Sequence, residues 1–297
     1  MTERIFTVVS RPGPVEERIL GRLAPIATDH RALGAGVSLR ALSTKPGPKT
    51  PVVLLHGRGH GATVWEPFIR AFAPERRVLA LDLPGFGHSG FLGEAPSDPE
   101  QALARFVDPI EAVVREQGPA VVVGHSLGGL VALELALRRA AELPALVLID
   151  AMGLGPYVTP RARAYLRAGP ERLLKLSRLV GKTSRLSGGV IGESAALREE
   201  LYLARGVTPP GRRAFDALLP LVGAPLHRRD RLGEVTAPTL LVWGERDEAF
   251  PLPVAVDARA RMPEAELSVI DAGHSPHLER PTETLEAVRA FLQSRGL

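Results

Sequence analysis

The chain contains the stretch Val121-Val122-Val123-Gly124-His125-Ser126-Leu127-Gly128-Gly129, a short apolar run that ends in a serine flanked by glycines. A segment rich in Leu and Ala follows at once, so the pattern predicts a strand, a sharp turn and a helix. Glycine suits positions 124 and 128 because a Cβ there would clash where strand and helix meet. Ser126 is therefore a candidate nucleophile, provided that the chain also supplies a base, an orienting acid and an oxyanion site.

Similar apolar runs recur along the chain, and runs without alternation indicate strands buried on both faces of a sheet. Helical patterns separate most of them, which predicts parallel strands with right-handed crossovers. Two short runs around the turn Gly34-Ala35-Gly36 predict a β-hairpin at the sheet edge. The expected fold is α/β, with a mostly parallel, doubly wound sheet. The expected strands are 51–55, 77–81, 120–123, 145–149, 239–242 and 267–270, and the expected helices are 64–72, 99–117, 127–140, 254–262 and 284–293.

The alternation of strands and helices stops between residues 152 and 235, where apolar residues recur only at helical spacing. We expect an inserted helical cap there, between two parts of the core at 29–151 and 236–297. Basic residues outnumber acidic ones in the cap. A basic cap would favour anionic substrates by focusing the electrostatic potential. The alternative interpretation is a solvated basic surface without a binding role. Residues 1–28 form an N-terminal extension with a short helix expected over 14–23.

Composition excludes several classes of protein. The chain has no cysteine, which rules out disulfides, thiolate metal sites and thiol catalysis. Its net charge of +4 comes from scattered arginines without a basic repeat, so we expect no nucleic-acid partner. No run approaches the roughly twenty apolar residues of a membrane span, and no signal peptide is visible. We expect a soluble, cytoplasmic protein with no membrane partner and a small-molecule substrate.

Two candidate partners for Ser126 follow later strands. Asp247 lies just beyond the run that ends at Val242, and His274 lies just beyond the run that ends at Ile270. Catalytic groups in open α/β sheets gather beyond the carboxyl ends of the strands. The chain order Ser126, Asp247, His274 therefore predicts a nucleophile, an acid and a base at one edge of the sheet.

With these motifs, residues 29–297 resemble the α/β-hydrolase fold superfamily, whose nucleophile turn and residue order match 124–128, Asp247 and His274. The resemblance implies acyl transfer to water through an acyl-serine on Ser126, with His274 as the base and Asp247 as the acid. The loop 81–89 also resembles a family loop that shapes the pocket.

The same resemblance implies an oxyanion hole made of backbone N–H groups. One donor is Leu127, which follows the nucleophile. The other comes from the loop His56-Gly57-Arg58-Gly59, with Arg58 as the first choice and Gly59 as the second.

Rival residues remain for the base and the acid. His277 lies three residues after His274, and the family pattern favours His277 as a structural histidine. Asp150 ends the sixth strand, where some relatives carry the acid, while loop position favours Asp247.

Other polar residues at strand ends have simpler interpretations. Turn, capping or hydrogen-bonding duties account for Asp82, Asp271, His56, His88 and His125, and Glu245 and Glu248 read as solvated loop charges. No His and carboxylate set has metal-ligand spacing, so we expect neither a catalytic metal nor a cofactor.

Three functions fit these motifs. The first is a hydrolase of carboxylic esters, lactones or thioesters. The second is a carbon–carbon bond hydrolase of ring-cleavage products, suggested by the glycine-rich loop 56–62, although such relatives usually carry proline where this chain has His60. The third is a ligand receptor without turnover. Serine at the turn argues against the aspartate-nucleophile dehalogenases and epoxide hydrolases. Cap aromatics that could line the pocket or pack within the cap are Tyr157, Tyr165, Tyr202 and Phe215.

Overall fold

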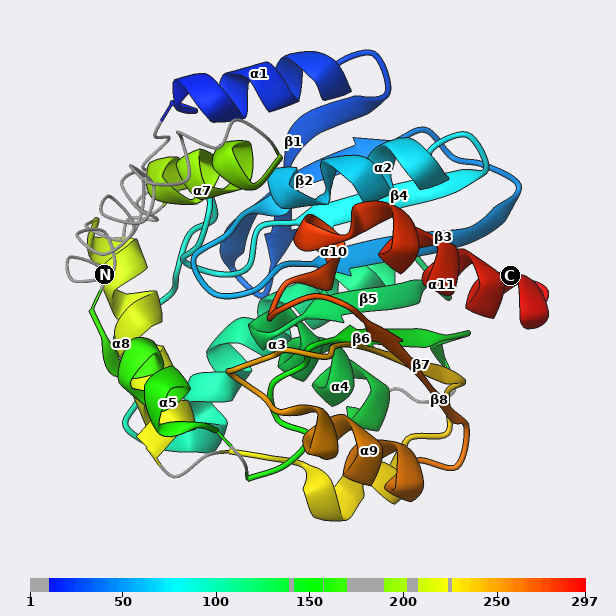
Figure 1. Cartoon of the computed structure of the whole chain (residues 1–297). Helices are drawn as coiled ribbons and strands as arrows, with labels where there is room; N and C mark the ends of the chain where they lie inside the picture. The colour runs from blue at the N-terminus through cyan, green and yellow to red at the C-terminus, as the bar shows by residue number, and fades with distance from the viewer. Residues whose placement is uncertain (1–10, 139–141, 157, 170–189, 202–207, 224–225) are drawn as a thin grey trace.

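The computed structural model describes residues 11–138, 142–156, 158–169, 190–201, 208–223 and 226–297, built around one eight-stranded sheet (Figure 1). The strand order is β1-β2-β4-β3-β5-β6-β7-β8; β1 and β2 run antiparallel to their neighbours and all other pairs are parallel. The predicted mostly parallel α/β sheet is confirmed. The strands are β1 (Ala27–Gly34), β2 (Val37–Thr44), β3 (Lys49–Leu55), β4 (Arg76–Leu81), β5 (Val121–His125), β6 (Leu146–Ile149), β7 (Thr239–Gly244) and β8 (Ala265–Ile270).

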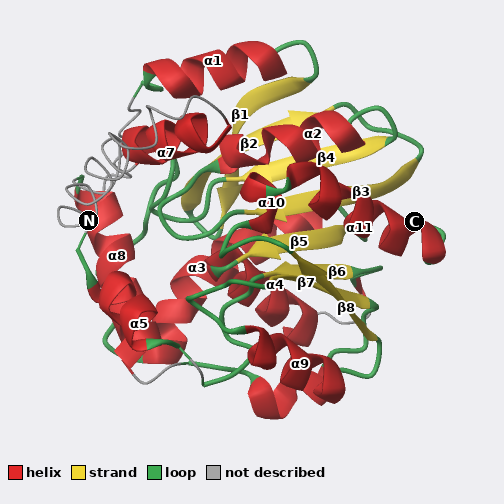
Figure 2. Ribbon diagram, viewed as in Figure 1, coloured by secondary structure: helices red, strands yellow, loops and turns green. Residues whose placement is uncertain are grey.

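Helices cover both faces of the sheet, as Figure 2 shows. On one face, apolar side chains of α1, α2 and α11 form a buried cluster with the sheet, and on the other face α3, α4 and α9 form a second one. Burial of these two apolar layers is the main force that holds the sheet together. The core helices are α1 (Pro14–Leu23), α2 (Glu66–Phe72), α3 (Pro99–Glu116), α4 (Leu127–Arg138), α9 (Leu252–Arg261), α10 (Pro276–Glu279) and α11 (Pro281–Ser294), with a 3-10 turn η1 (Ala62–Trp65) before α2.

Helix α3 begins after a capping side chain and ends near a glycine in the left-handed region. The Asp98 side chain accepts a hydrogen bond from the Gln101 N–H over 2.9 Å at the start of α3. Gly118, just past the end of α3, has a left-handed φ of 72° that favours glycine. The hairpin turn between β1 and β2 lies at Ala35 and Gly36, both with positive φ, as the sequence predicts.

Helix α1 is joined to the core by more than its apolar face. The side chain of Glu16 is buried and contacts Arg40 at 2.8 Å and His88 at 2.6 Å. The Glu200 carboxylate accepts the N–H groups of Val15 and Glu16 at the start of the helix. The N-terminal helix therefore connects the sheet with the segment inserted after β6.

The described secondary structure of the inserted segment consists of helices joined by turns and loops. Among the described residues, the α-helices between β6 and β7 are three, and they gather along one side of the molecule, at the left in Figure 1. Tyr157 and Tyr202 lie outside the described residues, as does the side chain of Tyr165, whereas Phe215 is buried in the core. The elements are α5 (Pro160–Arg167), α7 (Val190–Leu201), α8 (Pro209–Gly223) and a 3-10 turn η5 (Arg229–Glu234). Among the described helices, none is both long and apolar enough to cross a membrane.

Candidate active site

Ser126 occupies a one-residue turn between β5 and α4. Its φ of 53° lies in the left-handed region that non-glycine residues rarely adopt. A Cβ at Gly124 would lie 2.6 Å from the carbonyl carbon of Gly128, and one at Gly128 would lie 2.6 Å from the carbonyl oxygen of His56. Both glycines are required by close backbone approach, which is the physical reason for the pattern seen in the sequence.

The loops after β7 and β8 bring two further side chains to this turn. The His274 Nε2 lies 3.1 Å from the Ser126 Oγ, and the His274 Nδ1 lies 2.9 Å from the Asp247 Oδ2. These contacts join Asp247, His274 and Ser126 into one continuous hydrogen-bonded series. The geometry is the one that deprotonation of a serine by an oriented imidazole needs.

Asp247 is held rigidly in its loop. Its Oδ1 accepts the N–H of Ala249 at 2.6 Å and that of Phe250 at 3.1 Å, while its Oδ2 is left for His274. The Asp247 side chain has no solvent exposure, whereas the His274 side chain is 33% exposed. The acid is thus shielded from water and the base can still be reached.

The charge state of His274 follows from these contacts. Burial opposes a charged imidazole, but the hydrogen bond and the charge of Asp247, with a smaller contribution from Asp150, outweigh it and raise the pKa of His274 above its ordinary value. The imidazolium that forms when His274 takes a proton is therefore stabilised.

His277, the rival base, lies elsewhere. Its ring is fully buried and packs 4.7 Å from the Trp65 ring and 4.3 Å from the His125 ring, measured between centroids. Burial, followed by the charges of nearby histidines, lowers its pKa well below the ordinary value. The structure brings His274, and not His277, to the hydroxyl of Ser126.

The loop after β3 lies against the nucleophile. A Cβ at Gly57 would lie 3.2 Å from the Ser126 Cβ and 2.6 Å from the His125 Nδ1, so only glycine fits there. Leu127 is the first residue of α4, and its N–H has no acceptor four residues back in the helix. The assignment of Leu127 and Arg58 or Gly59 as oxyanion donors stays a prediction that this placement supports.

Arg58 also links the loop to the inserted helices. Its Nη2 donates to the carbonyl oxygen of Ala168 over 2.8 Å, and its guanidinium lies 4.7 Å from the centre of the Phe215 ring. Ala168 follows α5 and Phe215 belongs to α8. The loop proposed to supply an oxyanion donor is therefore anchored to two parts of the insertion.

Comparisons with known proteins identify the family of the chain. A sequence model of the alpha/beta hydrolase family matches residues 52–287. The chain belongs to the alpha/beta hydrolase family. Among curated relatives of this hydrolase chain, a pimeloyl-[acyl-carrier protein] methyl ester esterase from Aeromonas hydrophila is 30% identical, over 81% of the chain and 94% of the relative. A 2-hydroxy-6-oxononadienedioate/2-hydroxy-6-oxononatrienedioate hydrolase from Cupriavidus pinatubonensis is also 30% identical, over 75% of the chain and 80% of the relative.

Solved structures share the fold of this alpha/beta hydrolase. The 2-hydroxy-6-oxo-6-phenylhexa-2,4-dienoate hydrolase from Rhodococcus sp. strain RHA1 has a TM-score of 0.77 at 24% identity, with 90% of this chain and 99% of that chain covered. A thermophilic esterase from Thermogutta terrifontis has a TM-score of 0.71 at 24% identity, with 91% and 99% covered. Hydrolysis is the activity class shared by these relatives.

Two aspartates have roles that the sequence analysis missed. Asp82 was expected to serve a turn, but its side chain is fully buried. It accepts the N–H of Ala62 at 2.5 Å and that of His88 at 2.6 Å. It also lies 3.7 Å from the guanidinium of Arg40. Burial opposes its charge, yet Arg40 and the neighbouring histidines lower its pKa. Asp82 therefore ties η1 to the loop after β4, and only its contact with Arg40, which is distant in the sequence, reveals this role.

Asp150 is the second such aspartate. It is completely buried, and its φ of 41° is left-handed, as for Ser126. One carboxyl oxygen of Asp150 lies within 4.8 Å of a ring nitrogen of His274 and of one of His125. The sequence offered Asp150 only as an alternative acid, whereas the structure brings it beside the base together with Asp247.

The closeness of His125, Asp150 and His274 raises the question of a cation. Both ring nitrogens of His274 already contact Ser126 and Asp247, and the His125 Nε2 donates to the His274 carbonyl oxygen over 2.8 Å. A ring nitrogen that already takes part in one of these hydrogen bonds can bind a metal only if that bond breaks. A transition-metal site needs three or four ligand atoms, so these three side chains are better suited to proton transfer than to metal binding.

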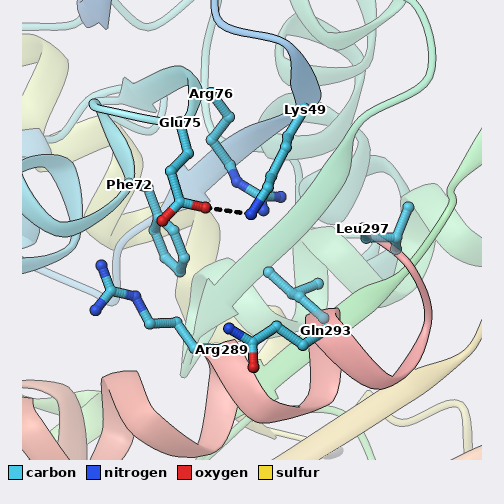
Figure 3. A pocket seen from close by; sticks show the side chains of 8 residues that line it. Lys49, Phe72, Glu75, Arg76, Arg289, Gln293 and Leu297 are labelled. Carbon is cyan, nitrogen blue, oxygen red and sulfur yellow. Dashed lines mark hydrogen bonds and ion pairs between the residues drawn. The ribbon is translucent and has the colours of Figure 1, made fainter.

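A shallow hollow lies at the other end of the sheet and is shown in Figure 3. The hollow is lined by Lys49 and Arg76, the first residues of β3 and β4, and by Arg289 of α11. Lys49 pairs there with Glu75. Because Ser126 follows the carboxyl end of β5, this hollow is separate from the candidate site.

Proposed function

We propose that this alpha/beta hydrolase is a serine hydrolase that cleaves a carboxylic ester, lactone or thioester through an acyl-serine on Ser126. The observation that carries the proposal is the hydrogen-bonded series from Asp247 through His274 to Ser126, with contacts of 2.9 and 3.1 Å. The left-handed backbone of Ser126 supports it, because strain of this kind is retained where it presents a reactive group.

In the acylation step, the Ser126 Oγ attacks the carbonyl carbon and its proton passes to the His274 Nε2. Asp247 keeps the proton on Nδ1 and stabilises the imidazolium. The negative charge on the carbonyl oxygen is met by the N–H of Leu127 and by one from the loop 56–59. Each such donor contributes about 3 kcal/mol in the transition state. Collapse of the intermediate releases the alcohol or thiol, which takes the proton from His274.

In the deacylation step, a water molecule attacks the acyl carbon and gives a proton to the His274 Nε2. The second tetrahedral intermediate collapses to the carboxylic acid, and Ser126 recovers its proton from His274. Protons and electrons balance with side chains and water alone, so we propose no cofactor. We also propose a small-molecule substrate, with neither nucleic acid nor membrane as a partner, and a cytoplasmic location.

A second candidate function is carbon–carbon bond hydrolysis of ring-cleavage products. It is supported by the relative from Cupriavidus pinatubonensis, which is as similar in sequence as the esterase relative. His60 favours ester hydrolysis, because ring-cleavage hydrolases usually carry proline at this place in the loop. The buried ring of His60 stacks on that of His125, with 6.2 Å between the centroids.

A panel of p-nitrophenyl esters from acetate to octanoate tests the proposal. We expect turnover by the unaltered protein, its loss in Ser126→Ala and His274→Ala, and no change in the matched control Ser97→Ala, which alters an exposed serine. If the protein is inert on esters and cleaves a dienone acid, the carbon–carbon function is correct. If it cleaves neither and binds a ligand tightly without covalent labelling of a serine, it is a receptor.

A further inference from the structure

The N-terminal helix α1 receives its cap from the inserted helix α7. Gly13, the residue before α1, has no side chain that could accept a hydrogen bond from the helix. The Glu200 carboxylate of α7 takes this place, with Oε1 2.8 Å from the N–H of Val15 and Oε2 3.0 Å from the N–H of Glu16. A negative charge at the N-terminus of a helix is stabilised by the free N–H groups and by the helix dipole.

A second contact joins the same two helices two turns away. Arg22 of α1 lies 3.1 Å from Glu193 of α7, and it also lies 2.6 Å from Glu66 of α2. Arg22 is seven residues after Val15 and Glu193 is seven residues before Glu200, which places both contacts on one face of an antiparallel helix pair (Figure 1). Both side chains of the second contact are exposed, so it is weak alone and Glu200 contributes most of the attachment.

Helix α7 also lies against the loop after β3. Leu201, the last residue of α7, is buried, and its two methyl carbons are 3.3 and 3.4 Å from the place that a Cβ would have at Gly61. Leu197, one turn earlier, belongs with Leu201 to the buried apolar cluster that contains Ala62. The segment 56–59, proposed to supply an oxyanion donor, lies two residues before Gly61. The position of α7 therefore limits the position of this loop.

The insertion is attached to the core independently at its base. The Arg228 N–H donates to the carbonyl oxygen of Gly153 over 2.7 Å, which joins the two ends of the insertion. The Arg228 side chain contacts Glu100 of α3 at 2.9 Å and also pairs with Glu134 of α4. Helices α3 and α4 cover the face of the sheet opposite to α1. Loss of the contact between α1 and α7 would therefore displace α7 without detaching the insertion.

We propose that Glu200 is a positioning residue, which caps α1 and thereby holds α7 against Gly61 and fixes the loop 56–59. This role rests on the function proposed above, since the loop matters for rate only if an oxyanion forms beside it. Oxyanion donors act through their placement, and a displacement of about 1 Å costs up to about 10²-fold in rate. Helix α1 thus acts on catalysis through α7.

Two glycines near α1 offer a matched pair of variants. In Gly13→Ala the new Cβ would lie 2.6 Å from the Glu200 carboxyl carbon, and it would push this flexible side chain aside. The φ of −79° at Gly13 is one that alanine adopts readily. Gly21→Ala adds the same methyl group to α1 where nothing lies within 4 Å. Glu200→Ala removes the cap outright, whereas Glu200→Gln keeps an oxygen that can accept the two N–H groups.

Steady-state kinetics with p-nitrophenyl acetate measure the effect on each variant. We expect kcat to fall about tenfold in Gly13→Ala and Glu200→Ala, with KM changed by less than about twofold, because ground-state binding does not use the oxyanion donors. Gly21→Ala should match the unaltered protein, and Glu200→Gln should recover most of the loss. The pH midpoint of kcat/KM should not move, since His274 keeps its contacts. A purely structural role would lower the melting temperature and leave kcat unchanged.

An unchanged kcat in a cooperatively melting Glu200→Ala would overturn the positioning role, as would equal losses in Gly13→Ala and Gly21→Ala. A shifted pH midpoint would also overturn it, because the effect would then pass through His274. If Glu200→Ala does not fold, Gly13→Ala decides, since it displaces the carboxylate without removing it. Failure of the unaltered protein to cleave the ester or to label at Ser126 with a fluorophosphonate would instead contradict the proposed function.

Discussion

The ring of His125 holds the main chain of His274, through a hydrogen bond of 2.8 Å from Nε2 to the carbonyl oxygen. A carbonyl oxygen only accepts, so the proton of His125 is on Nε2. Burial, followed by the charge of His274, lowers the pKa of His125 well below its ordinary value and keeps the ring neutral. The residue before the nucleophile therefore positions the loop that carries the base.

Replacement of His125 by alanine should loosen this loop. We expect kcat to fall by about 10²-fold with KM nearly unchanged, because a base displaced by about 1 Å loses its alignment with the Ser126 hydroxyl. Steady-state ester kinetics measure the effect. His125→Gln, whose amide can donate to the same carbonyl, should recover part of the loss, and equal losses in the two variants would contradict a role for this hydrogen bond.

The pH profile should report the raised pKa of His274. The base must be neutral before it accepts the serine proton, so kcat/KM rises as the pH passes through the pKa of His274 in the free protein. Because that pKa is raised, the midpoint of the acidic limb should lie above the ordinary imidazole value of 6.5. The limb is measured by kcat/KM from pH 5 to pH 9, and a midpoint below 6.5 would mean that Asp247 does not stabilise the imidazolium.

The turn at Ser126 should not tolerate a Cβ at position 128. In Gly128→Ala the new atom would lie 2.6 Å from the His56 carbonyl oxygen, and backbone cannot move aside as a flexible side chain can. We expect a loss of more than about 3 kcal/mol in the free energy of unfolding, by analogy with severe overpacking. Gly21→Ala is the matched control, since nothing lies within 4 Å of its Cβ, and it should stabilise α1 by up to about 1 kcal/mol. Urea unfolding of both variants decides whether the clash is real.

The buried charges around Glu16 should matter more for folding than any surface ion pair. Glu16→Leu leaves Arg40 buried without its 2.8 Å partner, and breaking such a pair costs about 3 to 5 kcal/mol in the free energy of unfolding. Asp108→Asn, which removes an exposed partner of Arg138, should cost less than about 1 kcal/mol. Similar costs for the two variants in urea unfolding would show that the buried network adds no stability.

Acid should weaken the same network in a definite direction. The pKa of Asp82 is lower in the folded chain than its ordinary value of 3.8. A lowered pKa contributes stability that is fully present above the ordinary value and is lost as the pH falls through the folded value. We therefore expect the contribution of Asp82 to persist at pH 5 and to disappear only below about pH 4. Asp82→Asn should flatten that acid limb of stability, measured by urea unfolding at each pH.

Much of the fold and part of the site could be predicted from local sequence. Glycines 124 and 128, the apolar strands and the hairpin turn at 34–36 depend on a few neighbouring residues, and each was predicted where the structure has it. The order of Ser126, Asp247 and His274 predicted a shared location because parallel strands end at one edge. The contacts of 2.9 and 3.1 Å among them now support that prediction.

What could not be predicted depends on residues far apart in the chain. Glu16 contacts His88 across 72 positions, and Asp150 acquires its environment only when β6 lies between β5 and β7. A single sequence gives no sign of such pairs, since each residue alone has an ordinary turn or helix-end role. Residues 170–189 and 202–207 of the expected cap lie outside the described residues. The cap boundaries at 152 and 235 stay a prediction.

The nucleophilic role of Ser126 is tested most directly by mass spectrometry of the labelled, digested protein, which locates the serine that reacts with a fluorophosphonate. We expect a single adduct on Ser126, absent from Ser126→Ala and formed at least about 10³-fold more slowly in His274→Ala. An adduct on another residue, or none on the intact protein, would contradict the claim that Asp247, His274 and Ser126 act together as a nucleophilic site.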